Sequence, residues 1–342
     1  MPEITVGVTA FNLEKYVYNC IQDLHRQTYQ SFEILIYDDC STDRTREYLA
    51  ELKEQFPAQI QVIYGEIPLK SPAKARNAIL DSGLIRGKYI VFLDGDDRIE
   101  ENFLEKLYVA AQKEQADIAL CAYDRFEDET GHVLCEEMRG FPAVISFPPE
   151  HGLAAFINGS LWNKLISVEC IGTTRLPLFS AGEDLSFLLA LYDKCRKIAC
   201  VDEVLIHYRV RGSSVISNTE EETVHQFAQE LLRLRTGTAK PWLKDTLELV
   251  AFIHIGISMP LRIYNNPDSD IDSLLRWVSA YFGQNFSWFR GQKLLQLPML
   301  LRYGVKGVGL WTAKICYRIH CFRLFLWLYQ AVTQRLHIDI KF

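Results

Sequence analysis

The sequence IVFLDGDDR, residues 90–98, joins an apolar run to three aspartates at positions 94, 96 and 97. With Tyr89 in front of it, the apolar run is typical of a strand buried on both faces of a sheet. Three carboxylates at the end of such a strand repel one another, and this disfavours their ionised form unless a positive charge lies nearby. The stretch therefore predicts a buried strand whose end lies beside a cation.

Strand and helix patterns alternate through the first 120 residues. Repeated strand–helix units predict an α/β fold with a Rossmann-like, mostly parallel central sheet and helices on both faces. Ser41, Thr42 and Asp43 offer N-cap chemistry for the helix that ends near residue 56. The expected strands are 4–10, 32–37, 59–64, 89–93, 117–122 and 204–210, and the other expected helices are 15–27, 73–84, 101–115 and one that begins near residue 183.

Two acidic clusters follow expected strands, Asp38-Asp39 and the aspartates of residues 94–97. Parallel sheets bind ligands at the carboxyl ends of their strands, so both clusters are expected at one ligand-binding edge. Asp-Gly-Asp is also a turn former, and Ser41 or Thr42 could simply cap a helix. Neither alternative explains two carboxylate clusters at the same edge. Hard oxygen ligands of this kind favour Mg²⁺ or Mn²⁺.

The length of 342 residues indicates one core domain and an appendage. We expect a domain over 1–218, with halves 1–98 and 99–218, and a helical region over 219–342. A net charge of −6 gives no footprint for nucleic acid. The nine cysteines, none in CxxC spacing, favour free thiols in a reducing cytosol. We expect no signal peptide and no spanning helix, because the N-terminus lacks a basic start and no stretch of ~20 apolar residues lacks charges.

Seven motifs together resemble family 2 glycosyltransferases of the GT-A fold, of the bacterial cell-surface polysaccharide type. The resemblance implies a nucleotide-sugar donor, with a UDP-sugar favoured, a divalent metal, and inversion at the anomeric carbon. It also implies a saccharide or lipid-linked acceptor. The motifs are VTAFN (8–12), FEILIYDDCSTD (32–43), AKARNAIL (73–80), GKYIVFLDGDD (87–97), LWNKLI (161–166), GEDLSFLLALY (182–192) and IHYRVRGSSVIS (206–217).

The resemblance assigns four residues to the donor nucleotide. Thr9 and Phe11 match the loop that lies against the nucleotide, although the family usually has Tyr where this chain has Phe11. Asp39 matches the carboxylate that receives the base N3–H, which fits uracil. Arg76 matches a residue near the diphosphate.

The metal motif of the family matches Asp94 and Asp96. Asp96 is the better direct ligand, Asp94 contacts ribose or a metal-bound water, and Asp97 has the weaker claim. Arg209 and Arg211 match a segment that closes over the diphosphate, and strand alternation puts both on one face. An exposed pair of charges is an equally good interpretation of these arginines.

The sequence GED places Glu183 and Asp184 where the family has its general base, and Asp184 matches best. Inversion needs one carboxylate to take the proton of the acceptor hydroxyl. Acids are also favoured at a helix start. Trp162 and Lys164 match the acceptor side, although Trp162 fits core packing equally well. His207 is more often structural than a metal ligand.

The last 53 residues, from Arg290, carry nine Lys or Arg and one acid, a net charge of +8 on a body of −14. Residues 300–342 interleave these charges with Trp, Phe and Leu, a composition typical of peripheral association with an anionic membrane. We expect a cytoplasmic protein at the inner face of the cell membrane. A helix packed on the body, or a contact between subunits of a homo-oligomer, is the alternative.

Three other functions compete with sugar transfer. A non-catalytic sugar-nucleotide-binding protein of the same fold would tend to lose Asp96 or Asp184, and both are present. A nucleotidyltransferase would need a basic glycine-rich loop, and residues 9–16, TAFNLEKY, contain none. An assembly protein that uses the basic tail would bind without turnover.

Overall fold

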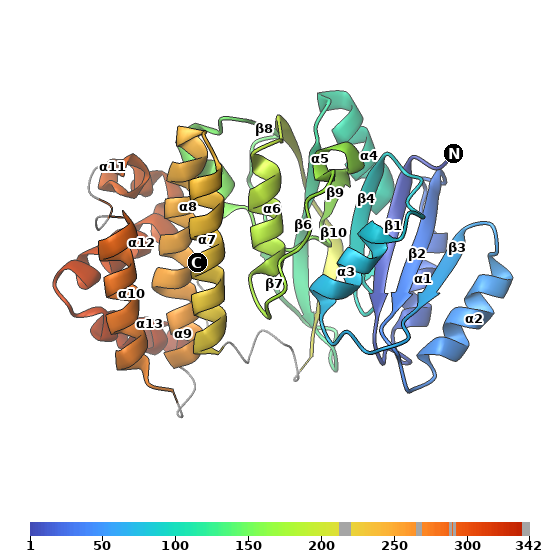
Figure 1. The fold of residues 1–342 in the computed structure, drawn as a ribbon, viewed down its shortest axis with the longest axis horizontal. Coiled ribbons are helices and arrows are strands. Elements are labelled where there is room, and N and C mark those ends of the chain that lie inside the picture. The colour runs from blue at the N-terminus through green and yellow to red at the C-terminus, as the bar shows by residue number, and fades with distance from the viewer. Residues whose placement is uncertain (212–219, 265–268, 287–288, 290–291, 337–342) are drawn as a thin grey trace. The chain divides into compact units, whose positions relative to one another are not determined.

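The computed structural model describes residues 1–211, 220–264, 269–286, 289 and 292–336 (Figure 1). The chain divides into two compact units. Unit 1 comprises Met1–Phe147 and Ile157–Ser214, and unit 2 comprises Pro148–Phe156 and Val215–Phe342. The expected boundary at residue 218 falls in 212–219, outside the described residues. The assignment of the short segment Pro148–Phe156 to unit 2 has no counterpart in the sequence analysis.

Unit 1 is built on one mixed sheet of ten strands in the order β3-β2-β1-β4-β9-β6-β10-β5, with β7 beside β6 and β8 beside β10. The strands β3, β2, β1 and β4 are parallel, as predicted. The sheet becomes mixed beyond them, because β9 runs antiparallel to both β4 and β6. The bounds are β1 Ile4–Ala10, β2 Phe32–Asp38, β3 Ile60–Tyr64, β4 Tyr89–Asp94, β5 Arg98–Ile99, β6 Ile118–Glu127, β7 Val133–Glu137, β8 Val144–Ser146, β9 Lys164–Ser167 and β10 Lys197–Val210.

Helices cover both faces of this sheet. One core cluster joins apolar residues of α1, α2 and α4 to the sheet, and Figure 1 shows α3 and α6 in front of it. The helix α3 begins after Ser71, whose side chain accepts a hydrogen bond from the Lys74 amide. The bounds are α1 Val17–His25, α2 Thr45–Gln55, α3 Pro72–Asp81, α4 Phe103–Glu114, α5 Val168–Ile171 and α6 Glu183–Tyr192.

The polar residues before α2 make the predicted cap and a further loop contact, because Asp43 Oδ1 accepts the amide of Thr45, the first residue of α2, at 3.0 Å. The N-cap of α2 is Arg44, and it makes no side-chain cap bond. Ser41 Oγ accepts the Asn12 amide at 3.0 Å, and Asp43 accepts the Glu14 amide at 3.1 Å. Ser41 and Asp43, which were expected to cap α2, therefore also hydrogen-bond the loop after β2 to the loop after β1.

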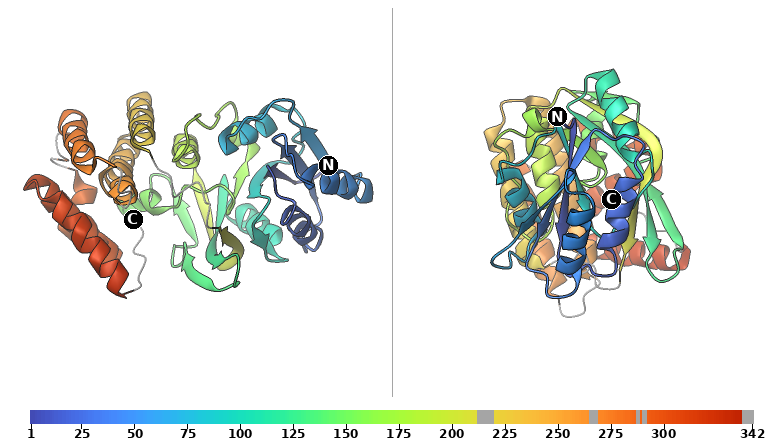
Figure 2. Two further views of the ribbon diagram at one scale, coloured as in Figure 1. Left: turned by 90° about the horizontal axis from the view of Figure 1, so that it is seen from below. Right: turned by 90° about the vertical axis from the view of Figure 1, so that its right-hand side faces the viewer.

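Unit 2 is helical. Its core is aromatic, with the rings of Phe252 and Phe282 6.0 Å apart and the Tyr317 hydroxyl donating to the Gly256 carbonyl at 2.7 Å. The last two helices, red in Figure 2, pack against each other. The bounds are η1 Glu150–Phe156, α7 Glu221–Gly237, α8 Pro241–Ile253, η3 His254–Ser258, α9 Met259–Tyr264, α10 Ile271–Phe286, η5 Lys293–Leu295, α11 Leu297–Leu300, η6 Leu301–Tyr303, α12 Gly304–Arg318 and α13 Phe322–Leu336.

One helical run in the described part of the chain, Pro241–Tyr264, has the length and hydropathy of a membrane span. Its most apolar window is 72% buried inside the protein, as in the core helix of a globular unit.

Candidate active site

The sheet brings the two acidic clusters together at the carboxyl ends of β1, β2 and β4. Thr9 of β1 lies opposite Asp94 of β4 on one side and Tyr37 of β2 on the other. Asp39 directly follows β2. The predicted ligand-binding edge is therefore present, with β1 between the two clusters.

On the nucleotide side of this edge, Phe11 is 49% exposed, so its ring is open to stacking. The Asp39 carboxylate is buried and accepts the backbone amides of Leu69 and Lys70. Lys70 and Cys40 have φ of +52° and +59°, a strained backbone for residues with side chains. A carboxylate has about four acceptor positions, so Asp39 keeps capacity for one further donor such as a base N–H.

Arginines of the chain balance the charges of the DGDD motif. Arg76 donates to Asp94 at 2.7 Å, and Arg211 pairs with Asp96 at 2.6 Å. The backbone amide of Arg209 donates to Asp97 at 2.9 Å. The cation expected at the end of this strand is thus present as guanidinium groups.

A buttress of two residues missed by the sequence analysis, Tyr16 and Asp128, holds Arg209 in place. Asp128 accepts Arg209 Nη1 and the Tyr16 hydroxyl, both at 2.7 Å. Arg209 and Arg211 both lie over the Tyr16 ring, at 4.8 and 5.6 Å, which confirms that they share a face. Asp128 directly follows β6, which ends at Glu127 and not at residue 122 as expected. With the correct strand length, Asp128 would have been recognised as a third acidic residue at the end of a strand.

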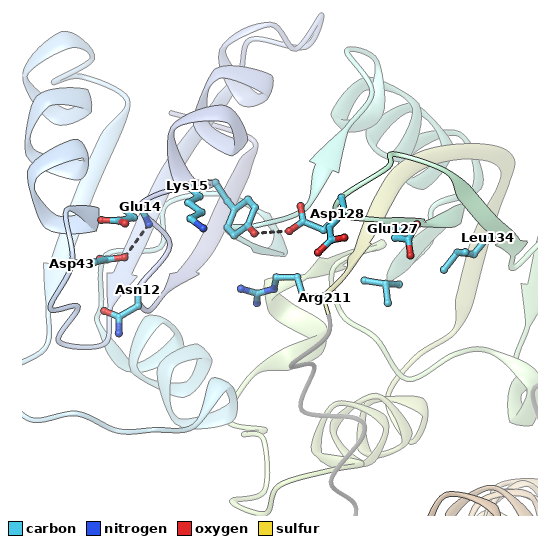
Figure 3. A pocket seen from close by; sticks show the side chains of 11 residues that line it. Asn12, Glu14, Lys15, Asp43, Glu127, Asp128, Leu134 and Arg211 are labelled. Atoms are coloured by element: carbon cyan, nitrogen blue, oxygen red, sulfur yellow. Dashed lines mark hydrogen bonds between the residues drawn. The ribbon is translucent and has the colours of Figure 1, made fainter. Parts of the chain in front are cut away.

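A polar cavity of about 590 Å³ lies beside this buttress (Figure 3). Arg211 is the one residue of the predicted site that lines it. Asp39, Asp94 and Asp184 lie outside its lining, so the chemistry is assigned to the sheet edge and not to this cavity. The lining consists of Asn12, Glu14, Lys15, Tyr16, Asp43, Glu127, Asp128, Glu129, Leu134, Val210 and Arg211.

The DGDD carboxylates suit a divalent cation. Burial, and then the charge of Asp94, raises the pKa of Asp96, while Arg211 opposes the shift. Burial raises the pKa of Asp97 further, and its Oδ2 is buried without a hydrogen-bond partner. Within the described residues, no three His, Cys, Asp or Glu side chains are grouped to hold a metal alone. This donor set fits Mg²⁺ or Mn²⁺ bound by one or two carboxylates together with substrate phosphates.

Arg76 connects the metal motif to the predicted base. Its guanidinium is buried and donates one nitrogen to Asp94 and another to Asp184, at 2.7 and 2.8 Å. Both terminal nitrogens are thus engaged by carboxylates, and the position of Arg76 near the diphosphate stays a prediction. Burial raises the pKa of Asp184, and Arg76 opposes that shift.

Three other residues named in the sequence analysis make structural contacts. Trp162 is buried and stacks on Tyr208 at 5.4 Å, so core packing describes it. Lys164 is completely buried, and no acceptor can touch it in this structure. His207 binds Asp124 through Nδ1 at 2.9 Å and Glu100 through Nε2 at 3.0 Å, a structural arrangement.

We expect Glu183→Gln to stabilise the protein above neutral pH. Burial, and then the charge of Asp184, raises the pKa of Glu183 to about 7. The folded state therefore binds a proton that the unfolded state releases, and stability falls as pH rises from about 4.5 to about 7. Glutamine removes this loss, worth up to about 3 kcal/mol at ~1.4 kcal/mol per pKa unit. Denaturation at pH 5 and pH 8 tests it, and an equal effect of the substitution at both pH values would contradict it.

The fold and site define a GT-A-type α/β protein, with acidic strand ends at one edge of a sheet. Residues 5–150 match the family described as Glycosyl transferase family 2. The resemblance found in the sequence is confirmed there.

Two bacterial relatives each match about two thirds of this chain. Glycosyltransferase GlyA of Streptococcus pneumoniae is 29% identical over 65% of this chain, but the match spans only 33% of GlyA. The UDP-Glc:alpha-D-GlcNAc-diphosphoundecaprenol beta-1,3-glucosyltransferase WfaP of Escherichia coli is 26% identical over 66% of this chain and 84% of its own.

Two solved structures share the fold. S. aureus TarS 1–349 in complex with UDP-GlcNAc has a TM-score of 0.65 at 18% identity, over 97% of this chain and 92% of the other. The mannosyltransferase PcManGT of Pyrobaculum calidifontis, in complex with GDP-Man and Mn²⁺, has a TM-score of 0.56 at 14% identity, over 99% and 88%.

Proposed function

We propose that this protein is an inverting, metal-dependent glycosyltransferase. It moves a sugar from a nucleotide-sugar, with UDP-sugar favoured, to a hydroxyl of a saccharide or lipid-linked acceptor in bacterial cell-surface glycan synthesis. The observation that carries the proposal is the chain of contacts Asp94–Arg76–Asp184, which joins the metal motif to a partly buried carboxylate. A donor site and a candidate base are thereby held together by one rigid guanidinium.

In this proposal, the nucleobase of the donor stacks on Phe11, and its N3–H donates a hydrogen bond to the Asp39 carboxylate. Asp96 would hold a divalent ion, which when bound would supply positive charge to the departing diphosphate. Asp184 takes the proton of the acceptor hydroxyl while the oxygen bonds to the anomeric carbon. The bond from that carbon to the diphosphate oxygen breaks, and its electron pair leaves with the nucleoside diphosphate. One general base is sufficient for inversion.

The relatives support the choice of substrates. The name of WfaP specifies UDP-Glc as donor and a saccharide on diphosphoundecaprenol as acceptor. TarS was solved with UDP-GlcNAc, and PcManGT with GDP-Man and Mn²⁺. These support a nucleotide-sugar with Mn²⁺ or Mg²⁺, and favour UDP over GDP because TarS has the higher TM-score.

Donor screening tests the proposal. UDP-, GDP- and dTDP-sugars are compared for metal-dependent thermal stabilisation, where a ligand at 100 Kd adds roughly 2.7 kcal/mol. Donor hydrolysis, and transfer to membrane extracts, are then measured with the best ligand. Donor binding without turnover on any acceptor would favour the alternative, a non-catalytic sugar-nucleotide-binding or assembly protein of this fold.

We also propose that the protein works at the inner face of the cell membrane, docked through α12 and α13. One side of these helices packs in unit 2, where Tyr317, Phe322 and Leu326 are buried. The other side exposes large apolar side chains, each between 36% and 64% exposed. They are Val308, Trp311, Leu324, Trp327 and Leu328, and two residues just outside these helices, Leu301 and Ile319, are exposed as well.

Charge favours anionic lipid as the partner of this apolar surface. Lys306 and Arg318 of α12 are exposed, and no acidic residue occurs between 290 and 336. Each basic residue near an anionic surface contributes about 1 kcal/mol, and buried apolar area adds about 25 cal/mol per Å². A second copy of the chain is the competing occupant.

We expect Leu324→Glu/Trp327→Glu to lose binding to anionic vesicles. Truncation is unsuitable as a test, because the removed helices supply buried residues of unit 2. The matched control is Ile67→Glu/Leu178→Glu, which changes two exposed apolar residues of unit 1 by the same charge. Sedimentation with phosphatidylglycerol vesicles should separate the two variants, and high salt should weaken binding. Equal pelleting of both, or a change from oligomer to monomer in the first, would contradict docking on lipid.

A further inference from the structure

Lys164 is a buried ammonium whose hydrogen bonds are all made to neutral oxygens. The side chain is completely buried. Its Nζ donates to Asn158 Oδ1 and the Ser160 carbonyl, both at 2.7 Å, and to Asn163 Oδ1 at 2.8 Å. Three donors meet three acceptors, so the group is geometrically satisfied. A buried charge is normally paired with an opposite charge, and none of these three acceptors is charged.

The segment held by Lys164 bears directly on the helix that carries the predicted base. All three acceptors lie between residues 158 and 163. Gly159 of this segment approaches the first turn of α6 so closely that a Cβ atom there would lie 2.6 Å from the Leu185 Cβ and 2.9 Å from its Cα. Because Leu185 follows Asp184, a shift of this segment would move the candidate base.

Asp184 is also the one carboxylate whose charge acts on Lys164. Burial lowers the pKa of Lys164 to about 7, and the charge of Asp184 opposes that shift. In return, Lys164 lowers the pKa of Asp184, which burial raises. The other charges that face Asp184 are those of Arg76 from α3, Asp94 from β4 and its neighbour Glu183.

We propose that Lys164 is a positioning residue for sugar transfer: it clamps residues 158–163 against α6 and, together with Arg76, supplies the positive charge that holds Asp184 in place. This inference rests on the proposed function, since it gives Lys164 a task only if Asp184 is the base. It replaces the expectation that Lys164 contacts the acceptor.

The test compares Lys164→Met with the wild type in a transfer assay with UDP-sugar and Mn²⁺. We expect kcat to fall at least about tenfold with the donor KM unchanged, because the donor site keeps all its groups. The acid limb of the kcat–pH profile should move to higher pH, since Asp184 loses a positive neighbour. A merely structural role would lower the melting temperature without moving that limb.

Asn158→Ala is the second variant, because Lys164→Met also leaves three oxygens without their donor. Asn158→Ala keeps the ammonium and removes one acceptor, so kcat should fall by a smaller factor with the acid limb in place. If Lys164→Met does not fold, unchanged kcat in Asn158→Ala overturns the inference. An unmoved acid limb in folded Lys164→Met also overturns it. No transfer by the wild type on any acceptor would instead refute the proposed function.

Discussion

Replacement of Asp184 by asparagine is expected to leave donor binding intact and to lower the transfer rate by ~10²–10⁴-fold. The amide has the shape of the carboxylate, and its oxygen can still accept the hydrogen bond that Arg76 donates at 2.8 Å. It cannot take a proton from the acceptor hydroxyl. Single-turnover transfer, measured alongside calorimetric UDP-sugar binding, separates the chemical step from donor binding.

Glu183→Gln is the matched control for this prediction, because it changes the adjacent carboxylate in the same way. We expect it to keep most of the transfer activity while altering the pH dependence of stability. Near-normal turnover of Asp184→Asn would show that Asp184 is not the general base. If Glu183→Gln were then inactive, Glu183 would be the base, and its pKa of about 7 would suit that role at neutral pH.

The strands that form the ligand-binding edge were predictable because local sequence determines them. The expected strand at 4–10 matches β1, and the expected strands at 32–37 and 89–93 each end one residue before β2 and β4 do. Long apolar runs bounded by charge give few alternatives for such strands. Their parallel order followed from the helices between them. The sequence alone therefore predicted that Asp39 and Asp94 lie at the same edge of the sheet.

The partners of the charged residues were not predictable, because they join segments far apart in the chain. Arg76 and Asp184 are separated by 108 positions, and Tyr16 and Asp128 by 112. Periodicity places each residue on a strand or helix, but it does not say which side chain meets which. The burial of Lys164 was missed for the same reason, since its acceptors are in a loop and β9 is a short strand.

The mixed half of the sheet and the segment Pro148–Phe156 show a second limit. The strands β5, β7, β8 and β9 have between two and five residues each, too few for periodicity to identify them. Pro148–Phe156 contains Pro and Gly and reads as a loop, yet Gly152 of unit 2 lies against Leu294, where a Cβ would be 2.6 Å from Cδ1. Assignment to a folded unit here depends on packing with residues more than 140 positions away.

Asp96→Ala is expected to abolish the Mn²⁺-dependent part of UDP-sugar binding, a loss of more than ~100-fold in affinity with metal present. Asp96 is the predicted direct ligand, and its removal also leaves Arg211 without the carboxylate it contacts at 2.6 Å. Asp128→Asn is the control, because it loosens Arg209 through the same buttress while leaving the metal motif intact.

Calorimetry with UDP-sugar, with and without Mn²⁺, distinguishes the two causes. If the arginines alone hold the donor, both variants should lose affinity equally, and chelation of the metal should matter little for the wild type. If Asp96 holds the metal, only Asp96→Ala should become insensitive to Mn²⁺, because only this variant lacks the carboxylate that would bind the ion. Unchanged UDP-sugar affinity of Asp96→Ala with Mn²⁺ present would show that the metal assignment is wrong.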